Sequence, residues 1–415
     1  MLRGTGTNFV VDRAATRAIA RAGMVSGAVF SDLDGDGFPE LVLACDWGSV
    51  RIFRNERGKF IEWPAPVSLL NSPLSTLNQL SGWWNSVATG DFDGDGRLDI
   101  VAGNWGRNTR FQSHRAQPQR IYFGDWMGNG VVFTFESYFD EGLKKYVPWT
   151  SANVARSLPL VSERFNSYEA FGGAGIQDIL GPKFPGAKSL EASWFETTLF
   201  LNRGDHFEAR LLPAEAQFSP VFGICVADFD GDGNEDIFLA QNFFALDGDT
   251  SRYDAGRGLL LAGDGRGGFR AVPGQESGIK VYGEQRGAAV CDFDGDGRAD
   301  LAVTQNGAET KLYHNTRARP GLRVKLKGPP GNPDGIGALL RLVSGGKPGP
   351  VREVHAGSGY WSQDAPTQVM AGAAPVTAVW CRWPNGRTNL VEIPAGAREV
   401  VLSPDGKADV EALKR

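Results

Sequence analysis

One nine-residue acidic pattern occurs four times in the chain, and it limits the folds open to this sequence more than any other feature. Each copy has the form Asp-x-Asp-Gly-Asp-Gly-x-x-Asp or Glu, and the copies start at residues 32, 91, 228 and 292. Repetition at a fixed period is typical of repeat architectures. The middle interval is about twice the other two, so we expect one unit between them to have lost the motif. The period is then close to 60 residues.

Short apolar segments surround every acidic copy. A β-rich run follows each one, and two further strands ending near Asn or Gly complete the unit. Four short strands per unit indicate an all-β chain built from propeller blades. We count about five blades, with six or seven possible, at 24–80, 84–137, 138–213, 219–280 and 285–318. Because the last unit lacks its final strand, we expect residues 8–11 to supply that strand and close the ring.

The acidic copies predict calcium loops. Four carboxylates per copy can converge on one centre, since Gly at positions 4 and 6 permits a tight turn, and six to eight oxygen ligands suit Ca²⁺ better than Mg²⁺. An EF-hand is excluded because an EF-hand loop requires Glu at its position 12, whereas the residue at that position of each copy is apolar. The turn at Asp125 lacks the other carboxylates and should bind no calcium. The predicted side-chain ligands are Asp32, Asp34, Asp36, Glu40, Asp91, Asp93, Asp95, Asp99, Asp228, Asp230, Asp232, Asp236, Asp292, Asp294, Asp296 and Asp300. The predicted backbone-carbonyl ligands are Phe38, Arg97, Asn234 and Arg298.

Charge supports bound cations with a structural role. The formal net charge is −5, and the loops hold a third of the 48 acidic residues. Four like charges within a few ångströms are unfavourable without a counter-ion, so we expect about four Ca²⁺ ions. No Lys/Arg block offers a nucleic-acid surface. No apolar run is long enough to insert into a membrane. The four cysteines lie in or beside apolar runs and read as buried free thiols.

The loops resemble the FG-GAP/VCBS repeats of integrin-type propellers. Motifs at 332–338, 352–363 and 379–386 are similar to the ASPIC/UnbV domain that follows such repeats in cartilage acidic protein-like chains. The resemblance implies an extracellular or cell-envelope protein. The first 24 residues contain no apolar segment of a signal peptide, so we expect any export signal to have preceded them.

The resemblance and the strand patterns divide the chain into parts. We expect a propeller over 1–318 with an irregular insertion near 138–198, including a short helix capped by Ser162. A small β-sandwich-like domain should occupy 319–403, and a loose tail 404–415. Within this domain, the Tyr360–Trp361 pair reads as core rather than as a contact surface.

A ligand face is predicted where the second strand of each blade ends. Amides beside indoles suit carbohydrate, although the same residues could simply cap strands and line a water-filled channel. The candidates are Asp46, Trp47, Asn104, Trp105, Gln241, Asn242, Gln305 and Asn306.

A second candidate site lies in the insertion, where an Arg/Tyr cluster could hold a uronate. Its members are Tyr146, Trp149, Arg156, Arg164 and Tyr168. The sequence therefore predicts a secreted calcium-binding module for adhesion to carbohydrate or protein. The alternative is a polysaccharide lyase or hydrolase acting on the propeller face. The oligomeric state is left open.

Overall fold

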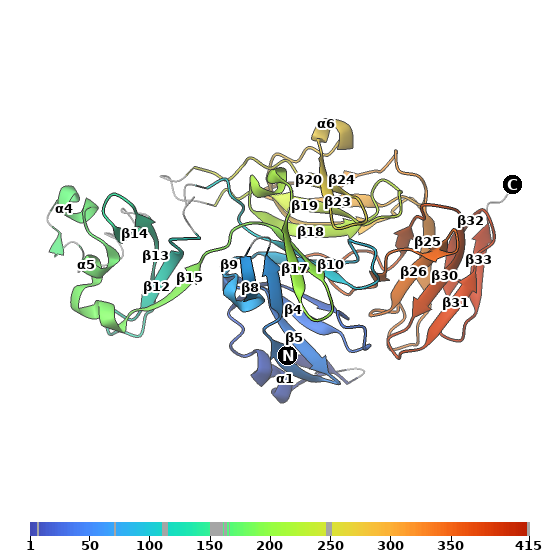
Figure 1. The fold of residues 1–415 in the computed structure, drawn as a ribbon, viewed down its shortest axis with the longest axis horizontal. Helices are drawn as coiled ribbons and strands as arrows, with labels where there is room; N and C mark the ends of the chain where they lie inside the picture. Colours follow the sequence, from blue (N-terminus) through green and yellow to red (C-terminus); the bar gives the residue numbers. More distant parts are fainter. Residues whose placement is uncertain are drawn as a thin grey trace.

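A computed structural model describes residues 1–5, 8–69, 72–109, 115–149, 161, 164–165, 167–245 and 251–412. The chain is nearly all-β, as predicted, and its sheets form three parts. Figure 1 shows an insertion at one end, the C-terminal domain at the other, and the propeller sheets between them.

Four sheets of the described residues follow the blade pattern, and each begins with the hairpin that carries an acidic loop. The first strands of successive blades contact one another. The blades are β3 (Met24–Ser31), β4 (Glu40–Gly48), β5 (Arg51–Glu56) and β6 (Lys59–Trp63); β10 (Ser86–Gly90), β11 (Asp99–Gly103), β16 (Thr198–Asn202) and β17 (Phe207–Leu211); β18 (Val221–Ala227), β19 (Asp236–Gln241), β20 (Leu259–Gly263) and β21 (Phe269–Val272); and β22 (Glu284–Cys291), β23 (Asp300–Asn306) and β24 (Ala308–Tyr313).

The predicted count of five blades was wrong, because units 84–137 and 138–213 form one blade. Residues 104–197 are an insertion between β11 and β16, so the long interval holds an added sheet and not a blade without its motif. The insertion starts well before the predicted residue 138. It comprises β12 (Gln119–Gly124), β13 (Phe133–Asp140), β14 (Lys145–Pro148), α4 (Tyr168–Gly172), α5 (Ile176–Leu180), the 3₁₀ helix η2 (Gly181–Gly186) and β15 (Lys188–Ala192).

The insertion misled the strand count because it buries a core of its own, which includes Trp126, Phe135 and Ile179. Its strands alternate like those of a blade, but their inward side chains pack on α5. The predicted helix cap, Ser162, lies outside the described residues. Ser167 caps α4 instead, accepting from the Ala170 amide.

The N-terminal residues do not close the ring. β1 (Leu2–Gly4) and β2 (Phe9–Val11) pair only with each other among the described residues, and both strands are exposed. The prediction that residues 8–11 complete the last blade was therefore wrong. The remaining elements are α1 (Arg13–Ile19), β7 (Pro66–Leu69), β8 (Ser72–Thr76), the 3₁₀ helices η1 (Leu77–Gln79) and η3 (Ala214–Gln217), β9 (Gly82–Trp83) and α6 (Gly274–Ser277).

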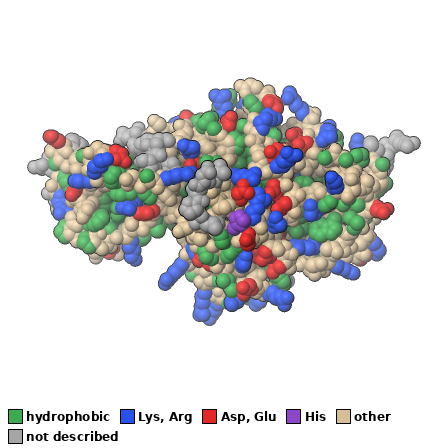
Figure 2. Space-filling model, viewed as in Figure 1, with side chains coloured by type: hydrophobic (Ala, Val, Ile, Leu, Met, Phe, Trp, Pro, Cys, Tyr) green, Lys and Arg blue, Asp and Glu red, His purple; other side chains and the backbone are tan. Residues whose placement is uncertain are grey.

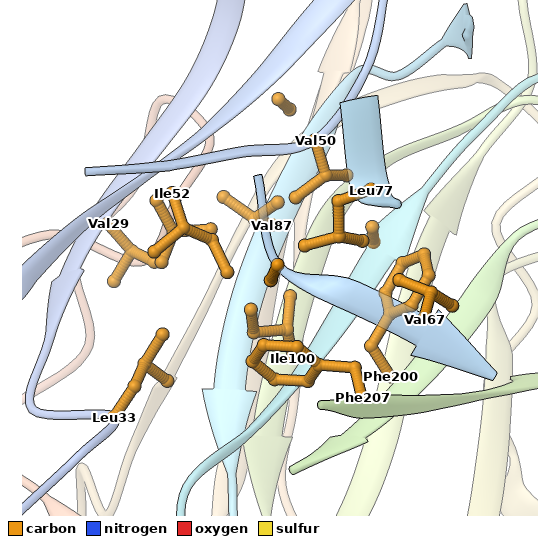
Figure 3. Packing of buried hydrophobic residues seen from close by; sticks show 14 of the residues in the cluster. Val29, Leu33, Val50, Ile52, Val67, Leu77, Val87, Ile100, Phe200 and Phe207 are labelled. Atoms are coloured by element: carbon orange, nitrogen blue, oxygen red, sulfur yellow. The ribbon is translucent and has the colours of Figure 1, made fainter. Parts of the chain in front are cut away.

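Apolar side chains hold neighbouring blades together. Figure 3 shows Val29 and Ile52 of the first blade close to Val87, Ile100 and Phe200 of the second. The side chains of Ile52, Val87, Ile100 and Phe200 are fully buried. Burying each one stabilises the fold by roughly 1.5–3 kcal/mol. This packing fixes the orientation of the acidic loops at the ends of the inner strands.

The C-terminal domain is a β-sandwich, as predicted, with a core that includes Leu340, Val379 and Trp383. The expected tail at 404–415 was wrong for its greater part, because β33 pairs with β32. The strands are β25 (Leu322–Leu326), β29 (Gln368–Met370), β32 (Ala397–Leu402) and β33 (Ala408–Ala412) in one sheet, and β26 (Leu339–Ser344), β27 (Lys347–Pro348), β28 (Arg352–Glu353), β30 (Val376–Arg382) and β31 (Thr388–Glu392) in the other.

One segment of the C-terminal domain, residues 355–365 (hereafter the channel loop), enters the centre of the propeller. It contacts the inner strands of all four blades. Gly359 bridges to Ala28, and a Cβ on Gly359 would lie 1.7 Å from the Val87 oxygen. Tyr360 packs on Phe222, and the Ala365 amide bonds to Val290. Only glycine fits at 359, both for this approach and for its φ of +78°.

The four cysteines form no disulfide. Cys45, Cys225 and Cys381 are buried free thiols, as predicted, whereas Cys291 is half-buried.

Candidate metal centres and ligand face

The first carboxylate of each acidic loop organises the turn. Asp228 accepts backbone hydrogen bonds from Gly231 at 2.7 Å and Gly233 at 2.9 Å. Asp292 makes the same pair of bonds in the fourth loop. Both glycines of every loop have positive φ, which explains why the motif needs them. The carboxylates are therefore held in place by backbone geometry.

The ninth carboxylate ties the loop to the third strand of its own blade. The Asp99 carboxylate accepts hydrogen bonds from the backbone N–H of Phe92 at 2.9 Å and from the backbone N–H of Asn202 at 2.7 Å. Asp236 and Asp300 bond to equivalent amides. One buried carboxylate thus fastens the acidic hairpin to the strand beside it.

The loops bring carboxylate oxygens close enough to hold a cation. Ligand atoms lie within 4.8 Å of one another at positions 1, 3 and 9 of three loops and at positions 1, 3 and 5 of the first. In the second loop one oxygen each of Asp91 and Asp93 is buried without a hydrogen-bond donor among the described residues. Such orphaned anionic oxygens fit a hard cation with oxygen ligands. Three of the four predicted carboxylates of each loop thus lie close enough to share a Ca²⁺ ion, while ligation by the fourth carboxylate and by the position 7 carbonyls stays a prediction.

The electrostatics of the loops agree with this fit. Burial raises the pKa of Asp99 to about 8, helped by the negative charge of Asp93 and Asp91. Burial likewise raises the pKa of Asp236 to about 8 and that of Glu40 to about 7. Without a counter-ion these carboxyls keep their protons to a higher pH than an ordinary carboxyl, because the charged form would be desolvated beside like charges.

Neighbouring blades are linked through the second residue of each of the first three acidic loops. The side-chain amide of Asn202 donates to the carbonyl of Leu33 in the preceding loop at 2.8 Å and to the carbonyl of Leu98 in its own loop at 3.1 Å. Asn315 does the same for Phe229 and Ala299. In the third blade the backbone amide of Gly267 binds the Phe92 carbonyl. The acidic loops are therefore joints between blades as well as within them.

The C-terminal domain docks on the acidic loops. Arg382 pairs with Asp32 of the first loop, and the Val351 amide donates to Asp91 of the second at 2.8 Å. Arg352 forms a two-pronged ion pair with Glu235 of the third, and Arg323 lies 3.0 Å from Asp292 of the fourth. Figure 2 shows acidic and basic side chains side by side near the centre of the face that it presents. Every acidic loop thus meets the C-terminal domain.

The family comparisons agree with this architecture. A model of FG-GAP-like repeats matches residues 32–102, and one of the FG-GAP repeat matches 286–312. A model described as ASPIC and UnbV matches 328–409. The chain carries FG-GAP repeats and a C-terminal ASPIC/UnbV domain. The resemblance seen in the sequence is thereby confirmed, and FG-GAP repeats indicate an extracellular type of binding or adhesion module.

No curated protein matches the chain. Among the described residues no helix is long and apolar enough to cross a membrane.

Most of the predicted ligand residues of the FG-GAP blades already serve the fold. Asn104 is fully buried; it donates to Trp194 and accepts from the amides of Trp83 and Trp105. Asn242 is also fully buried and bonds to Gly256 through both ends of its amide. These contacts match the alternative in which the amides cap strands. Asn104 and Asn242 do not line a water-filled channel, because the channel loop occupies the centre of the propeller.

The predicted aromatic residues gather in one cluster where the insertion meets the first two blades. Trp83 is its hub, with ring centroids 5.2 Å from Trp47, 5.1 Å from Trp105 and 5.7 Å from Trp149. Trp47 and Trp83 are buried. Beside them, burial raises the pKa of Asp46 to about 6. The cluster fixes the insertion on the propeller, and the pattern of the sequence gave no sign of Trp83.

The other predicted ligand residues differ in exposure. Gln241 is buried, whereas Gln305 is half-buried and Asn306 is exposed. Asn306 donates to Glu284 at 2.7 Å. Only the fourth blade therefore presents accessible amides of the predicted set.

The second candidate site in the insertion does not assemble among the described residues. Arg164 donates to the carbonyl of Ile179 at the end of α5, while the Tyr146 ring lies under Arg120. Trp149 belongs to the aromatic cluster. Arg156 and the side chain of Tyr168 lie outside the described residues.

The expectation that Tyr360 and Trp361 lie in the core of the C-terminal domain was wrong for both, because Tyr360 packs on Phe222 of the propeller and the Trp361 side chain is 83% exposed. The ASPIC/UnbV core is built without them, because the channel loop leaves that domain and carries both rings away.

Proposed function

We propose that the protein is a calcium-loaded extracellular module that binds carbohydrate or protein ligands. The observation that carries the proposal is the second loop, where two buried carboxylate oxygens of Asp91 and Asp93 lack any donor among the described residues. A cation with six to eight oxygen ligands meets that need, and Mg²⁺ fits less well because it retains much of its water. The shared motif extends the proposal to all four loops.

Calcium would act as a structural ion. Neutralising the loops would keep the ninth carboxylate ionised, and this carboxylate fastens each hairpin to its third strand. Because the same loops meet the C-terminal domain, the ions would also support the domain interface. Each occupied site stabilises the fold by about 2.7 kcal/mol when free calcium is a hundred times Kd.

The experiment is a count of bound calcium by equilibrium dialysis after chelation, with thermal unfolding in parallel. We expect about four ions per chain and a marked loss of thermal stability in chelator. Asp93→Asn should remove one ion. Asp125→Asn is the matched control, because Asp125 only accepts the amides of Gly128, Asn129 and Gly130 in an exposed turn.

Thermal stability that is insensitive to chelator, or a full calcium count in Asp93→Asn, would refute the structural role. A glycan array together with an activity screen on uronate polymers then separates binding from the lyase or hydrolase alternative. The contacts of Arg164 and Tyr146 give that alternative no support.

A further inference from the structure

The channel loop delivers two aromatic rings to the propeller end opposite the acidic loops. Tyr360 packs on Phe222, with ring centroids 5.7 Å apart, at the start of β18. The Trp361 carbonyl lies against Gly287 near the start of β22. Both strands run from this end toward their acidic loops. The C-terminal domain therefore docks on one face of the propeller and reaches through its centre to the other.

Trp361 combines a strained backbone conformation with an indole that is exposed to solvent. Its side chain is 83% exposed and its backbone φ is +45°. A bulky residue seldom adopts positive φ, and such strain is found mainly at functional sites. Packing elsewhere enforces the conformation, because Gly359 and Ala365 fasten the loop to two inner strands.

The two rings form a preset stacking surface. Tyr360 and Trp361 lie nearly parallel, at 8° with centroids 5.5 Å apart. Tyr360 is supported from below by Phe222, and the Arg286 guanidinium covers Phe222 at 4.1 Å. One face of the Tyr360 ring is thus occupied by the protein, while Trp361 is largely open to solvent.

We propose that Trp361, supported by Tyr360, is the stacking platform for a neutral carbohydrate ligand at the propeller end opposite the acidic loops. This inference rests on the proposed binding function and deepens it by naming the platform and the ligand class. A pyranose ring presents a flat C–H face that suits an indole, and hydroxyls that suit amides and alcohols at its edge. The exposed Asn306 lies on the adjacent end of β23 with its side-chain nitrogen donating to Glu284, whereas the Thr304 hydroxyl is already bonded to the backbone of Gly287.

Charge favours a neutral sugar over a uronate. The Arg286 guanidinium forms an ion pair with Glu284 at 2.6 Å and donates to the carbonyls of Asn242 and Gln285. Glu284 is itself buried and also binds Asn306. This ion pair keeps Arg286 from binding a sugar carboxylate.

The surroundings favour a sugar over a protein partner. In the channel loop and around the start of β22, the exposed large hydrophobic side chains are Trp361 and Tyr282. A stable protein interface buries roughly 800 Å² on each partner, with a core of several apolar side chains. Two exposed aromatic rings are too few for such a core and match a sugar ligand instead.

The test is titration of the calcium-loaded full chain with neutral gluco-, galacto- and manno-oligosaccharides, followed by tryptophan fluorescence and calorimetry. Matched polyuronate oligomers form the second arm. We expect one neutral series to bind, Trp361→Ala to weaken it at least tenfold, and Trp361→Phe to keep part of the affinity. Trp361→Gly should abolish binding and still fold, since glycine adopts positive φ freely.

Phe9→Ala is the control, because Phe9 is 75% exposed on the N-terminal hairpin. Unchanged affinity in Trp361→Ala, preference for polyuronate, or no binding by any neutral oligomer would each overturn the platform. Calcium count and thermal stability of the same variants separate this failure from failure of the calcium proposal, which would appear as lost ions in the unaltered chain.

Discussion

Replacing Asn202 by alanine tests whether the acidic loops act as joints between blades. Asn202 is 3% exposed, and its amide donates to the buried carbonyls of Leu33 and Leu98 while accepting from Gly204. Each buried polar group left without a partner costs about 1–3 kcal/mol. Two orphaned carbonyls therefore predict a loss of about 2–6 kcal/mol in the free energy of unfolding.

The chain offers a matched control in Asn55, the equivalent residue of the first blade. Asn55 is half-buried and bonds to Pro39 and Gly58 of its own blade, with no preceding loop to hold. Asn55→Ala should cost only about 1 kcal/mol. Urea unfolding in saturating calcium measures both variants, with the slope of the transition checked for constancy. Equal losses in the two variants would show that the link between blades contributes nothing.

Two further predictions concern charge. Arg382 pairs with Asp32, so the Arg382→Ala substitution removes a cation that competes with calcium. We expect calorimetry to show a several-fold higher calcium affinity of the first loop. Substitution of the exposed Arg398 by alanine is the control, and an unchanged calcium affinity in Arg382→Ala would contradict the competition. Burial raises the pKa of Asp46 to about 6, above the roughly 3.9 of an unfolded aspartate, so its contribution to stability is full below about pH 4 and is lost as the pH rises through 6, by about 2–3 kcal/mol. Asp46→Asn should remove that part of the pH dependence, and identical pH profiles of the two proteins would refute it.

The calcium loops could be predicted from sequence because their geometry is local. Nine consecutive residues place the carboxylates and the two glycines, and the turn hydrogen bonds span at most seven positions, as between Phe92 and Asp99. The sandwich core followed from alternating apolar strands such as β26 and β30. Neither inference depended on how distant segments meet.

The blade count failed for a different reason. Strands β12 to β14 have the length and alternation of blade strands, and only their pairing with β15 separates them from the propeller. Strand partnership across a long insertion is a long-range choice that local patterns do not encode. The same reason explains why the N-terminal strand was assigned to the wrong sheet.

The ligand face was mispredicted for its buried amides, because burial is also a tertiary property. Asn104 and Asn242 have the residue type of ligand groups, but the fold surrounds them with backbone partners. Trp361 looked like core in a small domain, yet the channel loop places it in solvent.

The sequence by itself determined the four acidic turns, the β-rich repeats and the presence of a second β-domain, since each is encoded in contiguous residues. The tertiary structure alone decided that the C-terminal domain docks on all four acidic loops and sends Trp361 through the propeller. Two of those contacts join residues at least 260 positions apart, the pairing of Asp32 with Arg382 and that of Asp91 with Val351, and their energies depend on packing that forms only when the whole chain has folded.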